Sequence, residues 1–525
     1  MNIKSCFLLF FIFFVSCGRV LHEENLSIFR YNQPSGISTL DPAFAKDQAT
    51  IWACNQLFNG LVQLNNNLEV VPSIAKSWKI SEDGLVYTFS IRTDVKFHKH
   101  HLISDNRVVV ASDFTYSLDR LKDKRLASPG VWILANVANY YSSNDSTFLI
   151  KLIKPFPPFL GLLTMQYCSV VPKEFADDKK FRDKPIGTGP FKFQYWKEGV
   201  KLVFRKNIDY FEKDKEFNLP YLDAVAITFI KDKQTAFLEF IKGNLDFISG
   251  IDASYKDQIL QRDGKLQEKY KGKIILQSSP YLNTEYLGFL MDDSVSPIKY
   301  LEVRQAINYG FDRKKMLNYL RNNIGTPALQ GFVPQGLPSF SENINGYYYS
   351  PEKAKKLLKD VGFENGKKIG KIILSTTSSY LDLCEYIQQQ LNEIGLDVVI
   401  QVNTSSTHRQ MVATSKLSFF RGSWIADYAD AENYLALFYS KNFCPDGPNY
   451  THFKSDKYDL LYEKASHEIL DSTRFKLYQE MDEMILEQAA IVPLYYDRVL
   501  RFCQPNIYGF NSNSMNLLDL KRVKK

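Results

Sequence analysis

Short apolar segments separated by turn residues alternate along the chain, and their spacing predicts a mixed succession of strands and helices. Residues 26–31 alternate apolar and polar positions, as a strand with one buried face does. Residues 371–400 read as a βαβ unit, because a helical stripe ending at Gly395 separates two short apolar runs. Such a unit predicts two parallel strands joined by a helix.

A β-hairpin is predicted around Asp83-Gly84, since this dipeptide favours a tight turn between two strands. After the turn, Tyr87, Phe89 and Ile91 occupy alternate positions and therefore share one face of a strand. We expect this face, together with Trp78 from the preceding strand, to pack in a hydrophobic core.

The strongest candidate for a ligand site follows the apolar run of residues 417–420, which is short enough to be a buried strand. Arg421, Trp424, Asp427 and Tyr428 come directly after it, and loops at strand ends often carry function. A carboxylate there can bind an ammonium group, and an indole face can bind an apolar or cationic group. The alternative is a solvated turn after a core strand, and this stretch by itself leaves both readings open.

Length and charge narrow the classes of function. A chain of 525 residues predicts two to four lobes. The formal net charge is +7, but the basic residues are spread along the sequence, with one cluster at residues 521–525. This pattern does not favour nucleic-acid binding. The Gly187-x-Gly189 pair is followed by Pro190 and a predicted strand, so it is not a phosphate-binding loop.

The first residues have the pattern of a processed signal. Lys4 precedes the apolar residues 7–15, a run too short to span a bilayer. Ser16 and Cys17 follow it, and residues 14–17 resemble the lipobox of bacterial lipoproteins. The resemblance implies lipid attachment at Cys17, which would anchor the protein to a membrane. Ordinary signal cleavage nearby, with Cys17 incidental, is the alternative.

The remaining cysteines and histidines do not predict a metal site. Five cysteines follow Cys17 with no C-x-x-C spacing, so at most two disulfides form and one thiol stays unpaired within the chain. His98, His100 and His101 lie on one predicted loop without a carboxylate, and we expect them to be solvated.

Several motifs occur in an order typical of one protein family. Residues 75–98 contain Ala75, Ser77 and Trp78, the Asp83-Gly84 turn, Tyr87-Thr88-Phe89, Arg92, Val95, Phe97 and His98. Residues 111–120, 155–159, 171–173, 186–191 and the predicted helix 304–313 follow in family order. This ordered set resembles the family 5 extracellular solute-binding proteins, the peptide-binding receptors of ABC importers. The family pattern continues with Asp-Gly where this chain has Lys99-His100-His101 and a longer loop.

The resemblance implies a periplasmic-binding-protein-like α/β fold, in which two lobes joined by a hinge close on a peptide and an additional domain extends the first lobe. The implied divisions are residues 1–16 as signal peptide, residues 17–58, 185–282 and 498–525 as lobe I, residues 59–184 as the additional domain II, and residues 283–497 as lobe III. The implied protein is a monomeric lipoprotein without cofactors on the periplasmic face of a bacterial membrane, serving an ABC permease and its ATPase.

Site residues carried over from the family lie in the Arg421–Tyr428 stretch. By resemblance, Asp427 pairs with the α-ammonium of the peptide, Arg421 reaches ligand carboxylates, and Trp424 forms a pocket wall beside Tyr428. Gly130 and Ser406 stand where one family binder has aromatic residues, so the shape of the pocket stays open.

Three alternatives remain at this point. The chain has no G-x-S-x-G, H-E-x-x-H or Walker motif that would indicate an enzyme. A second alternative keeps the fold and changes the ligand to a cell-wall peptide, haem or a nickel chelate. The third is a surface lipoprotein used mainly for adhesion.

Overall fold

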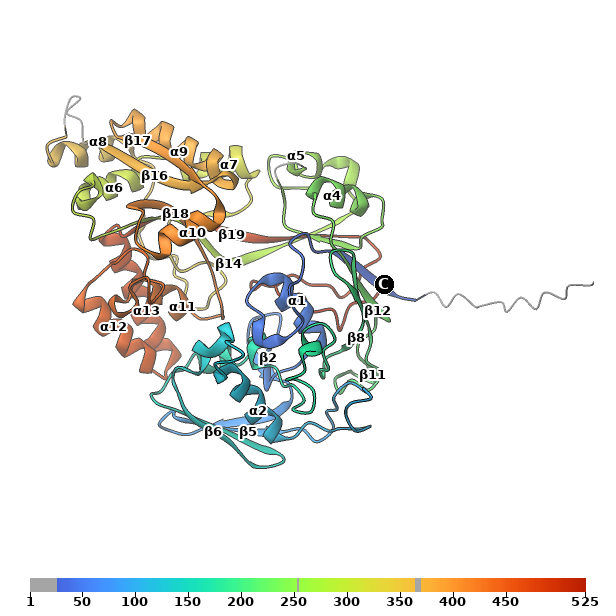
Figure 1. Ribbon diagram of the computed structural model, residues 1–525. Coiled ribbons are helices and arrows are strands. Elements are labelled where there is room, and N and C mark those ends of the chain that lie inside the picture. The colour runs from blue at the N-terminus through green and yellow to red at the C-terminus, as the bar shows by residue number, and fades with distance from the viewer. Residues whose placement is uncertain (1–25, 253–254, 364–369) are drawn as a thin grey trace, which may run out of the picture.

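The computed structural model describes residues 26–252, 255–363 and 370–525 and contains one large mixed sheet flanked by helices (Figure 1). Within these residues the sheet has 11 strands, in the order β17-β16-β18-β14-β19-β13-β1-β12-β9-β8, with β15 paired to β19. The strands are β1 (Ile28–Asn32), β8 (Phe191–Lys197), β9 (Lys201–Lys206), β12 (Ala224–Thr228), β13 (Phe247–Ser249), β14 (Ile275–Phe289), β15 (Thr326–Pro327), β16 (Lys371–Thr377), β17 (Asp397–Asn403), β18 (Phe419–Ile425) and β19 (Ile491–Cys503). The predicted α/β class is confirmed.

Two long antiparallel strands, β14 and β19, connect the two halves of the molecule (Figure 1). Their register runs from Ile275 opposite Cys503 to Gly288 opposite Ile491, and it shifts between Pro280 and Thr284. Pro280 has no N–H to donate, which weakens the ladder at this shift. On one side of it β19 pairs with β13, and on the other side β14 pairs with β18. The shift therefore marks the place where the sheet can bend.

The first half packs an aromatic core against the parallel strands β1, β12 and β13. Phe29, Tyr31, Trp52, Phe247 and Phe510 contact one another with ring centroids 5.0–6.4 Å apart. Large aromatic side chains in such tilted contacts supply much of the buried apolar area of a core. The helices of this half are α1 (Gln48–Leu57), α4 (Lys233–Ile241) and α5 (Lys256–Ile259).

Residues 59–184 form a four-stranded sheet in the order β4-β5-β7-β6, covered by helix α2. The predicted turn at Gly84 is present, with its N–H donating to Ser81 O over 2.8 Å. The predicted face of Tyr87, Phe89 and Ile91 is buried, and Trp78 packs against the same core. The elements are β4 (Ala75–Ile80), β5 (Val86–Ile91), α2 (Ala111–Lys122), β6 (Val137–Asn144), β7 (Thr147–Leu152), α3 (Phe159–Leu162) and the hairpin β2 (Val62–Leu64) with β3 (Val70–Pro72). Outside this segment, β10 (Lys213–Asp214) pairs with β11 (Phe217–Asn218).

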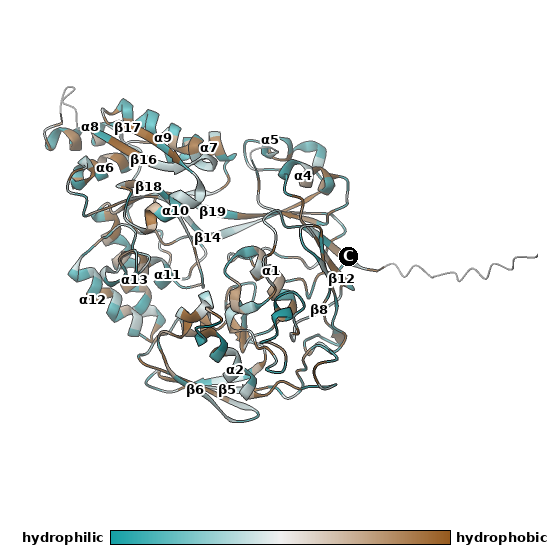
Figure 2. Cartoon of the chain, viewed as in Figure 1, coloured by the Kyte–Doolittle hydropathy of each residue, from teal (hydrophilic) through white to brown (hydrophobic). Residues whose placement is uncertain are grey.

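The second half is a sheet with a helical layer on each face. Phe419 of β18 packs in a cluster with α6–α9, and the next residue, Phe420, packs in a cluster with α11–α13. The βαβ unit predicted over residues 371–400 is present as β16-α9-β17, with the two strands parallel and adjacent. The outer helices α9 and α12 are largely hydrophilic in Figure 2. The helices are α6 (Leu301–Tyr309), α7 (Arg313–Arg321), α8 (Pro351–Asp360), α9 (Leu381–Glu393), α10 (Ser405–Ala413), α11 (Glu432–Leu435), α12 (Asp456–His467) and α13 (Asp471–Glu487).

The structure corrects the prediction of one helix over residues 304–313. Helix α6 ends at Tyr309, and α7 begins at Arg313. The Asp312 side chain accepts the N–H of Lys315 over 3.0 Å, so it caps a new helix instead of continuing the old one.

His98 is a second correction, because it is buried and not solvated. Gly187 N–H donates to His98 Nδ1 over 3.2 Å, and His98 Nε2 donates to Gly189 O over 3.0 Å. Burial lowers the pKa of His98 to about 4. A Cβ atom at Gly187 would lie 2.0 Å from Leu57 O, so glycine is required for this close packing against the end of α1.

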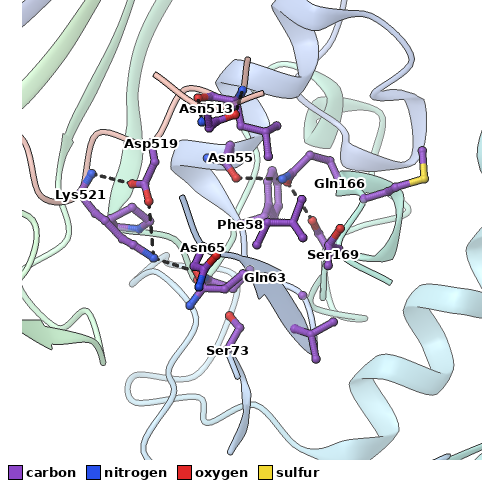
Figure 3. A pocket seen from close by; sticks show the side chains of 18 of the residues that line it. Asn55, Phe58, Gln63, Asn65, Ser73, Gln166, Ser169, Asn513, Asp519 and Lys521 are labelled. Carbon is purple, nitrogen blue, oxygen red and sulfur yellow. Dashed lines mark hydrogen bonds and ion pairs between the residues drawn. The ribbon is translucent and has the colours of Figure 1, made fainter. Parts of the chain in front are cut away.

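A small polar cavity of about 60 Å³ lies where α1, β2 and the C-terminal segment meet (Figure 3). Lys521 donates to Gln63 Oε1 over 2.8 Å and pairs with Glu212 at 3.0 Å. Asn55 accepts a hydrogen bond from Gln166 over 2.9 Å. The cavity is far below the several hundred Å³ of a ligand pocket. Its polar groups instead bind the end of the chain to the first half.

The cysteines after residue 17 are all free and buried, so none of them forms a disulfide: Cys54, Cys168, Cys384, Cys444 and Cys503. Among residues 26–252, 255–363 and 370–525, no helix is both long enough and apolar enough to cross a bilayer. Cys17 and the predicted signal peptide, residues 1–16, lie outside the described residues.

Candidate functional site

A cavity of about 840 Å³ opens between the two halves beside the strands β14 and β19. Its walls include Gly250–Asp252, which follow β13, and Ser378–Asp382, which follow β16. Crevices at the carboxyl ends of parallel strands are the usual ligand sites of α/β folds. The volume is within the range of a ligand pocket. We therefore take this interlobe cavity, together with the adjoining end of β18, as the candidate site.

The floor of the interlobe cavity contains a buried ion pair. Arg421 of β18 donates to the carboxylate of Glu285 on β14, and the side chains are 12% and 4% exposed. The guanidinium carbon of Arg421 lies 3.2 Å from the ring centroid of Tyr380, a favourable cation–π position. Burial opposes the charge of Arg421, but Glu285 and Tyr380 keep its pKa above the usual value. Asn283 also donates to Glu285, over 3.2 Å. The guanidinium is thus already neutralised by a protein carboxylate.

Asp427 is held by an amide at the end of β18. Asn433 Oδ1 accepts both the Trp424 indole N–H over 2.9 Å and the Asp427 main-chain N–H over 3.0 Å. The Asn433 amide also donates to the Asp427 carboxylate, over 3.4 Å. Among the described residues, no lysine or arginine forms an ion pair with Asp427.

The electrostatic surroundings of Asp427 favour a cation. Its side chain is exposed to solvent, yet the surrounding protein desolvates it enough to raise its pKa above the usual value. Burial raises the pKa values of Tyr434 and Tyr450 in the second half and of Tyr167 in the first half, and the negative charge of Asp427 adds to each of these shifts. An accessible carboxylate between the two halves, with only a neutral amide as partner, has capacity for an ammonium group.

Tyr428 lies in a contact between the halves. Its ring centroid is 6.5 Å from that of Trp132, and its side chain is 5% exposed. Its hydroxyl donates to Glu432, which also accepts the hydroxyl of Tyr462. Burial raises the pKa of Glu432 to about 7, although both tyrosines oppose that shift. Glu432 therefore fixes Tyr428 in this contact.

The structure separates two of the predicted site residues. Strand β18 continues to Ile425, so Arg421 and Trp424 belong to the strand and not to a loop after it. Side chains alternate along a strand, which directs Arg421 and Trp424 to opposite faces. Trp424 packs with the α11–α13 cluster. Arg421 therefore binds Glu285 on the floor of the interlobe cavity, while Trp424 binds the Asn433 side chain that also holds Asp427.

Sequence reasoning missed several polar residues of the site. They are Asn283 and Glu285 on β14, Tyr380 after β16, Asn433 in α11 and Asp497 on β19. An acid directly beside an apolar run was the available signal, because such a position requires a partner or a function. Glu285 precedes the run of residues 286–289, and Asp497 follows the run of residues 491–496.

A family model described as "Bacterial extracellular solute-binding proteins, family 5 Middle" matches residues 69–443. The chain is 26% identical to the dipeptide-binding protein DppE of Bacillus subtilis (strain 168) over 532 residues, covering 96% of this chain and 92% of that protein. It is 26% identical to heme-binding protein A of Haemophilus influenzae over 479 residues, covering 87% and 84%.

Among solved structures, the chain is similar to the ABC transporter-associated periplasmic binding protein DppA from Helicobacter pylori in complex with peptide STSA. The TM-score is 0.78 at 27% identity, with 95% of this chain and 98% of that chain covered. The resemblance and the periplasmic-binding-protein-like fold predicted from the sequence are confirmed.

Proposed function

Because the chain belongs to family 5 of the bacterial extracellular solute-binding proteins, we propose that it captures oligopeptides between its two halves and delivers them to an ABC permease. The observation that carries this proposal is the interlobe cavity of about 840 Å³. The carboxylate of Asp427, which has no cation in an ion pair with it among the described residues, follows the end of β18, the strand that pairs with β14. An extended peptide presents main-chain groups and one free ammonium, and this site offers strand ends and the accessible carboxylate of Asp427.

Other ligands of the family fit less well. One relative is a heme-binding protein. Haem iron is held by histidine, cysteine, methionine or tyrosine, and of these residue types only tyrosine, at Tyr380 and Tyr495, is among the described residues that line the interlobe cavity. A bare nickel ion, without a chelator of its own, would likewise find no imidazole or thiolate among the described lining residues. A cell-wall peptide remains within the proposed class, because it shares the peptide main chain.

We assign separate parts to the predicted site residues. Asp427 pairs with the α-ammonium of the peptide, and Trp424 holds Asp427 in place through Asn433. Tyr428 contributes to the contact between the halves. Arg421 supports the cavity floor through Glu285, since a ligand carboxylate would have to displace that partner.

Closure completes the proposed mechanism. We divide the described chain into lobe I (residues 26–58, 185–282 and 498–525), domain II (59–184) and lobe III (283–497). The two joints at 282/283 and 497/498 fall on β14 and β19, beside the register shift that follows Pro280. Bending there moves lobe III toward lobe I with domain II and shifts a pre-existing equilibrium when a ligand binds both.

Ligand identity tests the proposed function. Mass spectrometry of the protein, denatured after purification, should find co-purified peptides. An added peptide at 100 times its Kd should stabilise the fold by about 2.7 kcal/mol and raise Tm. Small-angle scattering should show a smaller radius of gyration with saturating peptide. Co-purified haem, or a peptide library that leaves both Tm and radius unchanged, contradicts the proposal.

We also propose that Cys17 carries lipid and anchors the protein to the membrane, as the Ser16-Cys17 pair after the apolar residues 7–15 implies. Cys17→Ala should abolish labelling by radioactive palmitate in the bacterium and release the protein from the membrane fraction or leave it unprocessed. Cys503→Ala, which changes a buried cysteine, is the matched control and should label normally. Normal palmitate labelling of the Cys17→Ala variant contradicts the anchor.

A further inference from the structure

A second carboxylate without an ion pair lies inside the interlobe cavity. Asp497 is on β19, is half-buried and lines the cavity. It accepts hydrogen bonds from Asn283 Nδ2 over 3.2 Å and from the main-chain N–H of Arg498 over 2.7 Å. Both donors are neutral, so neither hydrogen bond compensates the negative charge of Asp497.

The cations that line or support the cavity are bonded elsewhere. Their partners are Glu285 for Arg421, Asp382 for Arg321 at 2.8 Å, Asp252 for Lys233 at 2.7 Å, Asp257 for Lys256 at 3.3 Å, and Ser278 Oγ for Arg498 Nε at 2.7 Å. Within the described residues, Asp497 therefore has no lysine or arginine in an ion pair with it. On the floor of the cavity, Glu285 is thus paired with Arg421, whereas Asp497 has only neutral hydrogen-bond donors.

The surroundings already disfavour the charge of Asp497. Burial, followed by the nearby Glu285, raises the pKa of Asp497 to about 6, although Asn283 and Arg321 oppose the shift. Any closure of the lobes removes more water from this carboxylate. A desolvated anion is costly unless a cation joins it, so ligand binding is favourable only if the ligand or a proton supplies the positive charge.

A buried acid with a structural role looks different in the same chain. Asp482 is 2% exposed, and its carboxylate accepts the main-chain N–H groups of Phe332 over 2.7 Å and Val333 over 3.1 Å. It bridges two consecutive peptide groups and does not line the interlobe cavity. Asp497 bonds no distant main chain and faces a space large enough for a ligand. The contrast favours a binding role for Asp497.

We propose that Asp497 binds a cationic side chain of the peptide, the ammonium of a lysine-like or the guanidinium of an arginine-like residue. The inference rests on the proposed peptide-binding function and adds the chemical class of the preferred ligand. Asn283, which donates to Asp497, lies opposite Ile425 in the sheet, two residues before Asp427. One ligand can therefore present its amino terminus to Asp427 and a basic side chain to Asp497. The tyrosine rings at Tyr380 and Tyr495, which also line the cavity, provide apolar surface for the stem of that side chain.

Matched peptides test this subsite. The probes are tri-alanine peptides in which each position in turn is lysine or norleucine, which has the same four-carbon stem without the charge. Calorimetry with the wild-type protein should show that lysine binds about 10- to 100-fold more tightly than norleucine at one position at least. In Asp497→Asn this preference should fall to about threefold or less, while the norleucine peptide keeps its wild-type affinity, which shows that the site is intact.

Glu385→Gln provides the control for a general attraction of cations. Glu385 lines the same cavity but is exposed at its rim, so this variant should keep the preference for lysine. Equal wild-type affinity for lysine and norleucine peptides at every position overturns the subsite and leaves the peptide function standing. A lysine preference that survives in Asp497→Asn also overturns it. Failure of every peptide to bind overturns both proposals.

Discussion

Asp427→Asn should weaken the binding of a peptide with a free amino terminus by about 2–5 kcal/mol, as truncation of one member of a desolvated charge pair does. The variant replaces the carboxylate with an amide of the same shape, so Asn433 and the end of β18 need not move. What it loses is the charge that attracts the α-ammonium when the lobes close. Acetylating the peptide removes the other charge and should cost wild-type protein a similar amount.

A double-mutant cycle isolates this contact. Calorimetry with one peptide, free and acetylated, against wild type and Asp427→Asn gives the coupling energy between the two charges. We expect the variant to bind both forms with nearly equal affinity. Asp446→Asn, which removes an exposed carboxylate from the same half, should retain the wild-type difference. Equal wild-type affinity for the free and acetylated peptides would show that Asp427 does not bind the amino terminus.

Glu432→Gln should remove a loss of stability that the wild-type protein suffers as the pH rises from about 4 to 7. The pKa of Glu432 is about 7 in the folded protein and about 4.3 in an unfolded chain, so the folded state holds its proton more tightly. Stability from this group is therefore greatest below the unfolded pKa and falls until the pH passes the folded pKa. Between pH 5 and 8 the loss is about 2–3 kcal/mol at 1.36 kcal/mol per unit of pKa.

Urea unfolding at several pH values measures this effect. The difference in unfolding free energy between Glu432→Gln and wild type should increase in favour of the variant by about 2–3 kcal/mol from pH 5 to 8. If glutamine packs less well than glutamate, the difference in unfolding free energy changes by the same amount at every pH. Glu463→Gln is the control, because Glu463 is paired with Lys441 at the surface and its pKa is lowered instead of raised. A constant difference across this range would mean that Glu432 is charged at pH 5 in the folded protein.

The parts of the fold that local rules control were predictable. Strand alternation at Tyr87, Phe89 and Ile91, the Gly84 turn and the helix that ends before Gly395 all appear as expected. Each depends on contacts within a few residues, and over that distance the spacing of apolar residues in the sequence matches the spacing of buried positions. The prediction of a single helix over residues 304–313 was wrong because the Asp312 cap outweighs the helical spacing.

The candidate site was only partly predictable. The stretch that contains Asp427 stood out because an acid, an indole and a guanidinium follow a short apolar run. The partners of these residues come from positions far away in the chain. Glu285 is 136 residues from Arg421, and Asp497 is 214 residues from Asn283. No periodicity relates such positions, so neither the neutralised state of Arg421 nor the cation-free state of Asp497 was visible.

The sequence by itself determined the α/β class, most of the individual elements, the family and the segment that carries Asp427, because these depend on local spacing and on ordered motifs. Tertiary structure decided which charges are compensated. It placed Arg421 and Trp424 on opposite faces of β18 and buried His98 against Gly187 and Gly189. Within the described residues it left Asp497 at the interlobe cavity, and Asp427 after the end of β18, without a cation in an ion pair. The physical reason is that the energy of a charge depends on its distance to other charges and to water, and only the folded chain sets those distances.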